Sequence, residues 1–340
     1  MFVKYRPIRP SDLPECVDCV PNASTIGGEE RKALLTFWLE LLGRGSASGA
    51  VMEDASGGGS ILWFSLKVFI GSGYATHLKT EAAPFVDREV MRSWVKGDCP
   101  CLSEPEIRRA NSTTGVTILM LAAGSPSRYD TADELRSLSD RVVDFARYCS
   151  GGYRCNELLQ EFHDDDACAW ASGAGFRLRT DYPRHYTAGD PTDGRRRARL
   201  YGVTAAEAAA SAGTLVSTIF SYEEPRFFFR PNEQDLLLEA LVGETDEALA
   251  ESLGIALVTV RKRWESIYEK VESRRPEILV DGKAVDRSRG TEKKRRLLGY
   301  LRQHPEELRP CEPEGVTLPN GQISLRLGPK APEAAGATSQ

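Results

Sequence analysis

The stretch LLLEALVGETDEALAESLGIALVTVRKRWESIYEKV, residues 236–271, predicts two short helices joined by a tight turn. Ala250 is small enough for a second helix to cross close above it. Four residues later, Gly254 can take the left-handed conformation that a sharp turn requires. The predicted apolar face consists of Leu249, Leu253, Ile255, Val260, Ile267 and Val271. The basic run 261–263 falls on or beside the opposite face, as a helix-turn-helix needs to place one helix in the DNA major groove.

A longer pattern surrounds this pair of helices. It consists of Pro231 and Glu233, the core pair Leu236 and Leu237, Gly243, the run AESLGI at 250–255, TVR at 259–261, and Ile267, Tyr268 and Lys270. In these residues the segment resembles the DNA-binding domain of LuxR/FixJ-type response regulators. The resemblance implies a homodimer that binds double-stranded DNA through its second helix. The DNA contacts that it implies are Thr259, Arg261, Lys262, Arg263, Ser266 and Lys270.

Three positions depart from the family's pattern. Ala256 replaces the Ser that usually caps the recognition helix, and such a loss typically costs about 0.5–2 kcal/mol of helix stability. Val258 replaces a usual Lys and so removes a phosphate contact, and Trp264 replaces a polar residue. Sigma-factor region 4 has a similar pattern, and a helical pair without a nucleic-acid role is a further alternative.

The charge of this region is uneven. Residues 230–272 contain five basic and ten acidic side chains, which is an unusual balance for a DNA binder. The next stretch is basic, and we call its charged residues the basic flank: Arg274, Arg275, Arg287, Arg289, Lys293, Lys294, Arg295 and Arg296. We expect the basic flank to share the phosphate contacts, which are the main source of affinity for DNA. A solvated helix face is the alternative.

The whole chain has the composition of an ordinary globular protein. Its 340 residues favour two domains, and its hydrophobic content of 41% is enough for their cores. The net charge of −5 excludes a uniformly basic nucleic-acid coat protein. No stretch approaches the roughly 20 consecutive apolar residues of a membrane span, and the N-terminus lacks the apolar core of a signal peptide. We expect a cytoplasmic protein without membrane contact.

Cysteine and histidine are the candidate metal ligands. Cys16 and Cys19 form a CxxC pair, and Cys99 and Cys101 form a CxC pair, so a zinc site or a redox pair is conceivable. Nothing in the sequence indicates that the two pairs meet. The histidines, at 77, 163, 185 and 304, have no ligand spacing. We therefore predict no metal and no cofactor.

Residues 1–186 show an order of strands and helices that predicts an α/β domain with a mixed sheet. The runs ILWFSLKVFI at 61–70 and GVTILMLAAG at 115–124 predict buried strands, because they are short, branched and aromatic. Further strands are predicted at the N-terminus, at 51–52, 153–162 and 176–182. Helices are predicted at 29–42, 87–94, 131–148 and 166–174.

Two short segments carry a second resemblance. They are YRPIRPSDLPE at 5–15, and Ala169 and Trp170 followed by Gly173, Gly175 and the run FRL at 176–178. In these segments and in the order of its elements, the domain resembles a GNAT acetyltransferase, in which Gly-Phe begins the closing strand. Enzymes of that family bind the coenzyme A pyrophosphate with a Gly-rich loop after the central strand.

The residues at that junction do not fit a phosphate loop. The junction reads AAGSPSRYDTADEL, with one Gly, a Pro that lacks an N–H, and acids that repel phosphate. The pair Gly151 and Gly152 follows the next helix, at its wrong end. We therefore expect a non-catalytic sensing or dimerising domain, although an acyl-CoA or other small-molecule pocket remains open. The carboxylates Asp164, Asp165 and Asp166 are expected to complement the dipole of the following helix.

The predicted organisation has five parts. They are the α/β domain 1–186, a linker with a connecting helix 187–228, an all-α helix-turn-helix domain 229–273, a basic extension 274–309 and a flexible tail 310–340. Residues 187–202 are rich in Gly, Pro, Asp and Arg, as linkers are, and 205–220 predict one helix between domains or protomers. The three phenylalanines at 227–229 are expected to pack in a core.

These observations lead to one main hypothesis and two alternatives. The main hypothesis is a sequence-specific transcriptional regulator that responds to a small-molecule or protein signal. The first alternative is a GNAT-type N-acetyltransferase fused to a helix-turn-helix module. The second is a non-catalytic protein-interaction module, which the acidic surface around the second helix favours.

Overall fold

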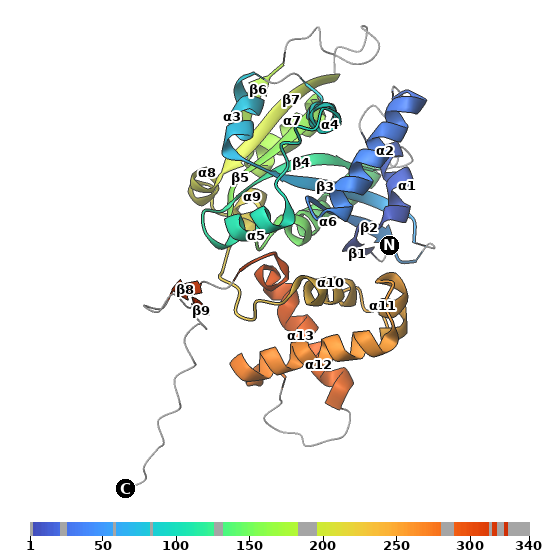
Figure 1. The fold of residues 1–340 in the computed structure, drawn as a ribbon. Coiled ribbons are helices and arrows are strands. Elements are labelled where there is room, and N and C mark those ends of the chain that lie inside the picture. Colours follow the sequence, from blue (N-terminus) through green and yellow to red (C-terminus); the bar gives the residue numbers. More distant parts are fainter. Residues whose placement is uncertain are drawn as a thin grey trace. The chain divides into compact units, whose positions relative to one another are not determined.

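The computed structural model describes residues 3–20, 26–56, 59–81, 84–125, 132–182, 196–279, 289–312, 315–317 and 323–325. The chain divides into two compact units, Met1–Glu223 and Glu224–Gln340 (Figure 1). None of the helices in the described ranges has the length and hydropathy needed to span a bilayer.

A seven-stranded sheet forms the centre of the first unit, in the order β1-β2-β3-β4-β5-β7-β6 (Figure 1). The strands are β1 Val3–Pro7, β2 Ala47–Asp54, β3 Ile61–Ile70, β4 Val116–Gly124, β5 Cys155–Asp164, β6 Arg177–Asp181 and β7 Arg196–Thr204. β4 and β5 pair in parallel, and the other neighbouring strands in this sheet pair antiparallel. The predicted mixed α/β sheet is therefore confirmed.

Helices cover both faces of the sheet (Figure 1). They are α1 Leu13–Asp18, α2 Gly28–Gly43, α3 Ser72–Thr80, α4 Val86–Val95, α5 Glu104–Ser112, α6 Ala132–Ser150, α7 Asp165–Ala174, α8 Ala205–Ala210 and α9 Leu215–Ile219. Helices α1 to α4 share one apolar cluster with one face, and α5 and α7 to α9 share another with the opposite face. Side chains alternate between the faces, so Leu159 joins the first cluster and Leu158 the second.

The structure differs from the predicted linker. Residues 196–204 form β7, which lies between β5 and β6 in the sheet, and 187–195 lie outside the described residues. Ala198, Leu200 and Val203 are buried, but neighbouring Arg and Gly residues mask this apolar pattern in the sequence. The predicted connecting helix is instead the two short helices α8 and α9, which pack within the first unit. Strand β6, which follows Phe176, is therefore not the closing strand of the chain.

Gly124, the last residue of β4, is in close contact with the end of α1. A Cβ atom added at this position would lie 1.8 Å from the carbonyl oxygen of Cys19. Non-bonded atoms do not approach so closely, so only glycine fits here without a shift of the backbone. The contact holds the carboxyl end of the central strand against the segment that follows α1.

The second unit contains the helices α10 Pro231–Ala240, α11 Asp246–Ser252, α12 Leu257–Arg274 and α13 Arg289–Gln303, with 3₁₀ turns Pro276–Ile278 and Pro305–Leu308. Phe227 and Phe229 are each 1% exposed in its apolar cluster, so the prediction that this run packs in a core is confirmed for both. Glu307 is buried too, and its carboxylate accepts hydrogen bonds from the backbone N–H groups of Arg226 and Phe227, at 2.9 and 3.0 Å.

Part of the predicted flexible tail has secondary structure. Strands β8 Gly315–Thr317 and β9 Ile323–Leu325 pair antiparallel. Residues 326–340, which include the segment expected to be disordered, lie outside the described residues.

Candidate functional site

The turn between α11 and α12 has the predicted geometry. Gly254 has a positive φ of 62°, the left-handed conformation that ends a helix sharply. The N–H of Ile255 donates to the carbonyl of Ala250 at 3.0 Å, and the N–H of Gly254 to that of Glu251 at 3.1 Å. Ala256 is the N-cap residue of α12 and provides no side-chain hydrogen bond, as the sequence indicates. Four residues therefore reverse the chain between two packed helices.

The helix pair packs on α10 through a common core. Leu249 of α11 and Val260 of α12 are fully buried, together with Leu236 of α10. Trp264, which departs from the family's polar residue, is 5% exposed in the same core. Its ring is stacked on Tyr268, with 5.6 Å between the ring centroids. The departure at 264 thus adds to the core of the unit.

Three of the six predicted DNA contacts face α10. Ser266 donates a hydrogen bond to Glu233 at 2.8 Å, Lys270 forms an ion pair with Glu233, and Arg263 donates to the carbonyl of Asn232 at 3.1 Å. Glu233 is 2% exposed and also accepts from the N–H of Arg230. Burial alone would raise the pKa of Glu233, but Lys270 and the hydrogen bonds hold it below its usual range. These side chains thus have structural partners within the unit.

The other three predicted contacts lie toward the start of α12. Arg261 and Lys262 are exposed, and neither has a hydrogen-bond or ion-pair partner among the residues that the structure describes. Thr259 is half-buried, and Val258 beside it is 58% exposed. The N-terminal half of α12 therefore presents two unpaired positive charges to solvent.

Most described charges of the basic flank have acidic partners. Lys293 pairs with Glu272 at 2.6 Å, and Lys294 pairs with Asp246 at 3.0 Å. Arg295 and Arg296 pair with Glu292 on their own helix. The pairs neutralise much of this charge locally. Of the two interpretations of the basic flank, this favours a solvated helix face over a surface that contacts phosphate. Arg287, and the side chain of Arg289, lie outside the described residues.

A second candidate site lies where β4 and β5 separate. Their parallel pairing ends at Met120 and Gln160, although β4 continues to Gly124 and β5 to Asp164. Beyond these residues β4 pairs with β3, and β5 with β7. The carboxyl ends of the two parallel strands therefore diverge. In open α/β sheets, ligands bind outside the carboxyl ends of parallel strands.

Acidic side chains gather at the carboxyl end of β5. The carboxylate of Glu161 accepts hydrogen bonds from the N–H groups of Phe85 and Val86, at 2.8 and 2.7 Å, and so caps α4. The body of α4 contacts β4, so the helix connects the two diverging strands. Asp87, half-buried in the first turn of α4, interacts electrostatically with Glu161 and with His163. The ring of His163 is stacked on Phe85.

Burial shifts the protonation of this carboxyl pair. It raises the pKa of Glu161 to about 7, against the opposing effect of the two N–H groups. Burial and the neighbouring charge of Glu161 raise the pKa of Asp87 to about 6. Burial lowers the pKa of His163, which favours its neutral form. Asp87 and Glu161 can thus each gain or lose a proton near neutral pH.

The sequence interpretation did not include this carboxyl pair. Glu161 is one polar residue in a strand and Asp87 is one of several acids in a helical turn, 74 positions earlier in the sequence. Neither has a local motif. The Asp cluster that the sequence did single out has the expected helix-dipole role, because Asp164 accepts the N–H of Ala167 at 2.7 Å and caps α7.

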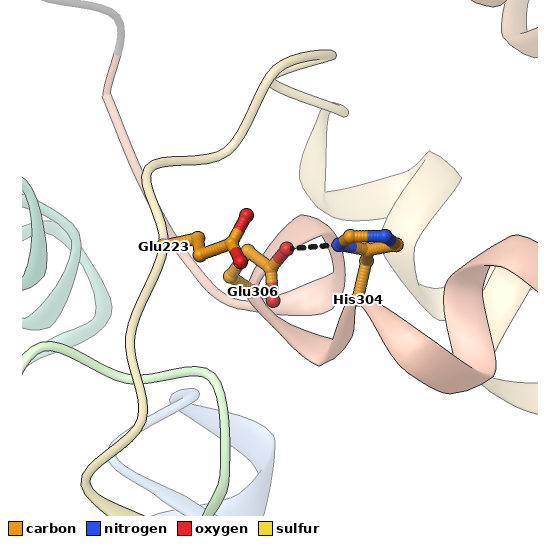
Figure 2. A group of neighbouring side chains, drawn as sticks. All are labelled: Glu223, His304 and Glu306. Atoms are coloured by element: carbon orange, nitrogen blue, oxygen red, sulfur yellow. Dashed lines mark hydrogen bonds and ion pairs between the residues drawn. The ribbon is translucent and has the colours of Figure 1, made fainter.

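The two cysteine pairs are the remaining metal candidates from the sequence. Within the described ranges, Cys16, Cys19, Cys99 and Cys101 do not form a group of three or more ligands. His304 Nδ1 lies 2.8 Å from Glu306 (Figure 2). Figure 2 also draws Glu223, which is the last residue of the first unit, whereas His304 and Glu306 belong to the second. We therefore assign no metal site to these three residues. Residues 126–131, the core of the predicted non-phosphate junction, lie outside the described residues.

No protein-family model matches the chain, and no curated protein matches it. Several solved structures are similar. Spermidine/spermine N-acetyltransferase SpeG from Vibrio cholerae has 10% identity and a TM-score of 0.36, covering 62% of this chain and 96% of that chain. The C-terminal condensation domain of Ebony, in complex with beta-alanyl-dopamine, has 12% identity and a TM-score of 0.36, covering 60% and 99%.

A third similar structure is histone acetyltransferase HPA2 and related acetyltransferase from Corynebacterium glutamicum. It has 15% identity and a TM-score of 0.32, covering 59% of this chain and 96% of that chain. At these identities and TM-scores, the similarities assign neither an activity nor a substrate to this chain.

Proposed function

We propose that the chain is a GNAT-type N-acyltransferase fused to a helix-turn-helix module. The observation that carries the proposal is the divergence of β4 and β5 beside the carboxyl pair Asp87 and Glu161. The resemblance of residues 5–15 and 169–178 to GNAT acetyltransferases supports the proposal. The proposal replaces the expectation that the domain is non-catalytic. The predicted absence of a glycine-rich phosphate loop remains a prediction.

The acyl donor in this proposal is an acyl-coenzyme A thioester. Where β4 leaves β5, the backbone groups on that side of β4 no longer face a neighbouring strand. The pantetheine arm of coenzyme A contains amide groups, which can pair with such a strand edge as an added strand does. The thioester would then lie between the strands, on the α4 side of the sheet.

The acceptor in this proposal is a primary amine. Its nitrogen attacks the thioester carbonyl carbon, the carbon–sulfur bond breaks, and coenzyme A leaves as a thiolate that takes a proton from water. The amine loses its own proton to Asp87, whose raised pKa suits a base working near neutral pH. Glu161 positions α4 and, by its charge, helps to raise the pKa of Asp87.

Isothermal titration calorimetry of the purified full chain with acetyl-coenzyme A tests whether the donor binds. We expect saturable binding that free coenzyme A competes away. No heat of binding up to about 1 mM, where the binding free energy is only about −4 kcal/mol, would overturn the proposal. Binding without transfer to any amine would instead restore the sensing role.

Asp87→Asn tests the role of the base. We expect the transfer of acetyl groups to spermidine to slow by about 10²–10⁴-fold, with unchanged affinity for acetyl-coenzyme A. In the unmodified chain the rate should fall as pH drops below about 6, because protonated Asp87 cannot accept a proton. Mass spectrometry of the acetylated amine measures both. Asp166 is an exposed acid on α7, so Asp166→Asn is the matched control and should leave the rate of transfer unchanged.

We infer DNA binding as a second candidate function, for the second unit. It rests on the tight turn between α11 and α12. It rests also on the positively charged side chains of Arg261 and Lys262 at the start of α12, which have no partner among the described residues. In a helix-turn-helix, the N-terminal residues of the second helix contact the base edges. The acids Glu265 and Glu269 follow on the exposed face, so contact would be limited to the first turns. The LuxR/FixJ resemblance implies a dimer.

The double variant Arg261→Gln, Lys262→Gln tests this candidate. We expect weaker retention of genomic DNA fragments, and a salt dependence of log K that is smaller by about 2 per bound protomer, because two phosphate neutralisations are lost. The matched control, Lys96→Gln with Arg109→Gln, removes the same charge from exposed sites of the first unit. Equal loss in both variants would indicate a net-charge effect, and no retention of the unmodified chain at low salt would favour protein interaction.

A further inference from the structure

Two of the eight cysteines differ from the rest. Cys99 and Cys101 are half-exposed, whereas Cys16, Cys19, Cys149, Cys155, Cys168 and Cys311 are buried. Burial in apolar surroundings makes a thiol inert, and partial exposure beside polar groups makes it reactive. Modification of the folded protein should therefore be confined to this pair.

The backbone at one end of the pair is anchored to the sheet. Cys101 forms a β-bridge with Ile70 at the end of β3, and the N–H of Leu102 donates to the carbonyl of Phe69 at 2.7 Å. In an extended chain, side chains two positions apart lie on the same side. Cys99 and Cys101 are two positions apart, and each shifts the pKa of the other, as thiols that lie close together do.

The spacing allows a disulfide between the two residues. Two residues along a strand place Cα atoms about 6.6 Å apart, near the upper end of the range of about 4.4–6.8 Å seen in disulfides. Such a bond carries strain, and strained disulfides are the ones that are easily reduced. The bond would thus be reversible and not a permanent crosslink.

The surroundings identify the attacking thiol. The interaction with Cys101, assisted by the guanidinium of Arg44, lowers the pKa of Cys99 against the opposing effects of burial and Glu40. The interaction with Cys99, together with burial, raises the pKa of Cys101. Cys99 is therefore the more readily ionised thiol of the pair.

We propose that Cys99 and Cys101 form a redox-sensitive pair, which a small-molecule disulfide such as oxidised glutathione converts reversibly into an intramolecular disulfide. The thiolate of Cys99 attacks one glutathione sulfur and releases a first reduced glutathione. Cys101 then loses its proton to solvent and attacks the Cys99 sulfur, which releases the second. Two electrons pass from the pair to the oxidant.

Peptide mapping of the folded full chain tests the proposal. Trypsin releases residues 97–108, which contain both cysteines of the pair and no others. After treatment with oxidised glutathione and alkylation, we expect this peptide to lose two hydrogen atoms, and dithiothreitol to restore it. The peptides with the six buried cysteines should remain reduced and unalkylated before denaturation.

Two variants separate the steps. In Cys101→Ser the reaction should stop at a stable mixed disulfide between Cys99 and glutathione, because the second thiol is missing. In Cys99→Ser, Cys101 should react more slowly than Cys99 does in Cys101→Ser, because the burial that raises the pKa of Cys101 remains when Cys99 is gone. Glutathione on both cysteines of the unmodified chain, or equal rates in the two variants, would overturn the proposal. Circular dichroism before and after oxidation confirms that the chain stays folded.

Discussion

Glu233→Ala should lower the free energy of unfolding of the second unit by about 2–4 kcal/mol. Glu233 is 2% exposed, and its carboxylate binds Lys270, Ser266 and the N–H of Arg230. Its removal leaves a partly buried ammonium and a backbone donor without their partner, and such groups cost more than the lost bonds themselves. Urea-dependent hydrogen exchange of peptides from α10 and α12 measures the change locally.

Glu265→Ala is the matched control for this prediction. Glu265 lies on the same helix as Lys270 but is exposed, so its loss should change stability by no more than about 0.5 kcal/mol. If Glu233→Ala were equally mild, the network between α10 and α12 would contribute little. Ser266 and Lys270 would then be available for DNA after all.

Gly124→Ala should destabilise the first unit by about 3 kcal/mol or more. The added methyl group would lie 1.8 Å from the Cys19 carbonyl oxygen, so the end of α1 or the end of β4 must move. Backbone on both sides of the contact leaves no flexible side chain to absorb the overlap. Chemical unfolding followed by far-UV circular dichroism measures the loss.

A second glycine of the same unit provides the control. A Cβ at Gly173, inside α7, has nothing within 4 Å. Gly173→Ala should therefore stabilise the unit by about 0.5–1 kcal/mol through the helix propensity of alanine. Similar effects of the two substitutions would mean that the contact between α1 and β4 is looser than the structure describes.

The sequence predicts those elements whose pattern is set by local burial. The strand at 61–70 is buried along nearly its whole length, and the turn at Gly254 needs a conformation that glycine adopts readily. The sequence does not predict strand β7, because arginines and a glycine interrupt its apolar residues, although Ala198 and Leu200 are buried. The segment at 187–202 is rich in Arg, Gly, Pro and Asp, which indicates a linker as long as its partner strands β5 and β6 are not known.

The candidate sites show a different limit. Helical periodicity places Ser266 and Lys270 on the polar side of α12, but it does not identify their partner, Glu233, which lies 33 and 37 positions away. The carboxyl pair at the end of β5 depends in the same way on a contact between distant segments. Composition and spacing reveal which side chains are polar, and only the tertiary contacts reveal which of them are already engaged.

The place of β7 in the sheet determines where the chain can be divided. A fragment that ends at residue 186 keeps β5 and β6 but loses the strand that joins them. One long side of β5 would then offer unpaired N–H and C=O groups, which recruit other chains into aggregates. Protein synthesis meets the same constraint, because the nascent chain cannot complete its sheet until Thr204 has emerged from the ribosome. A stable first unit for separate expression must therefore extend past α9, to about the end of Met1–Glu223.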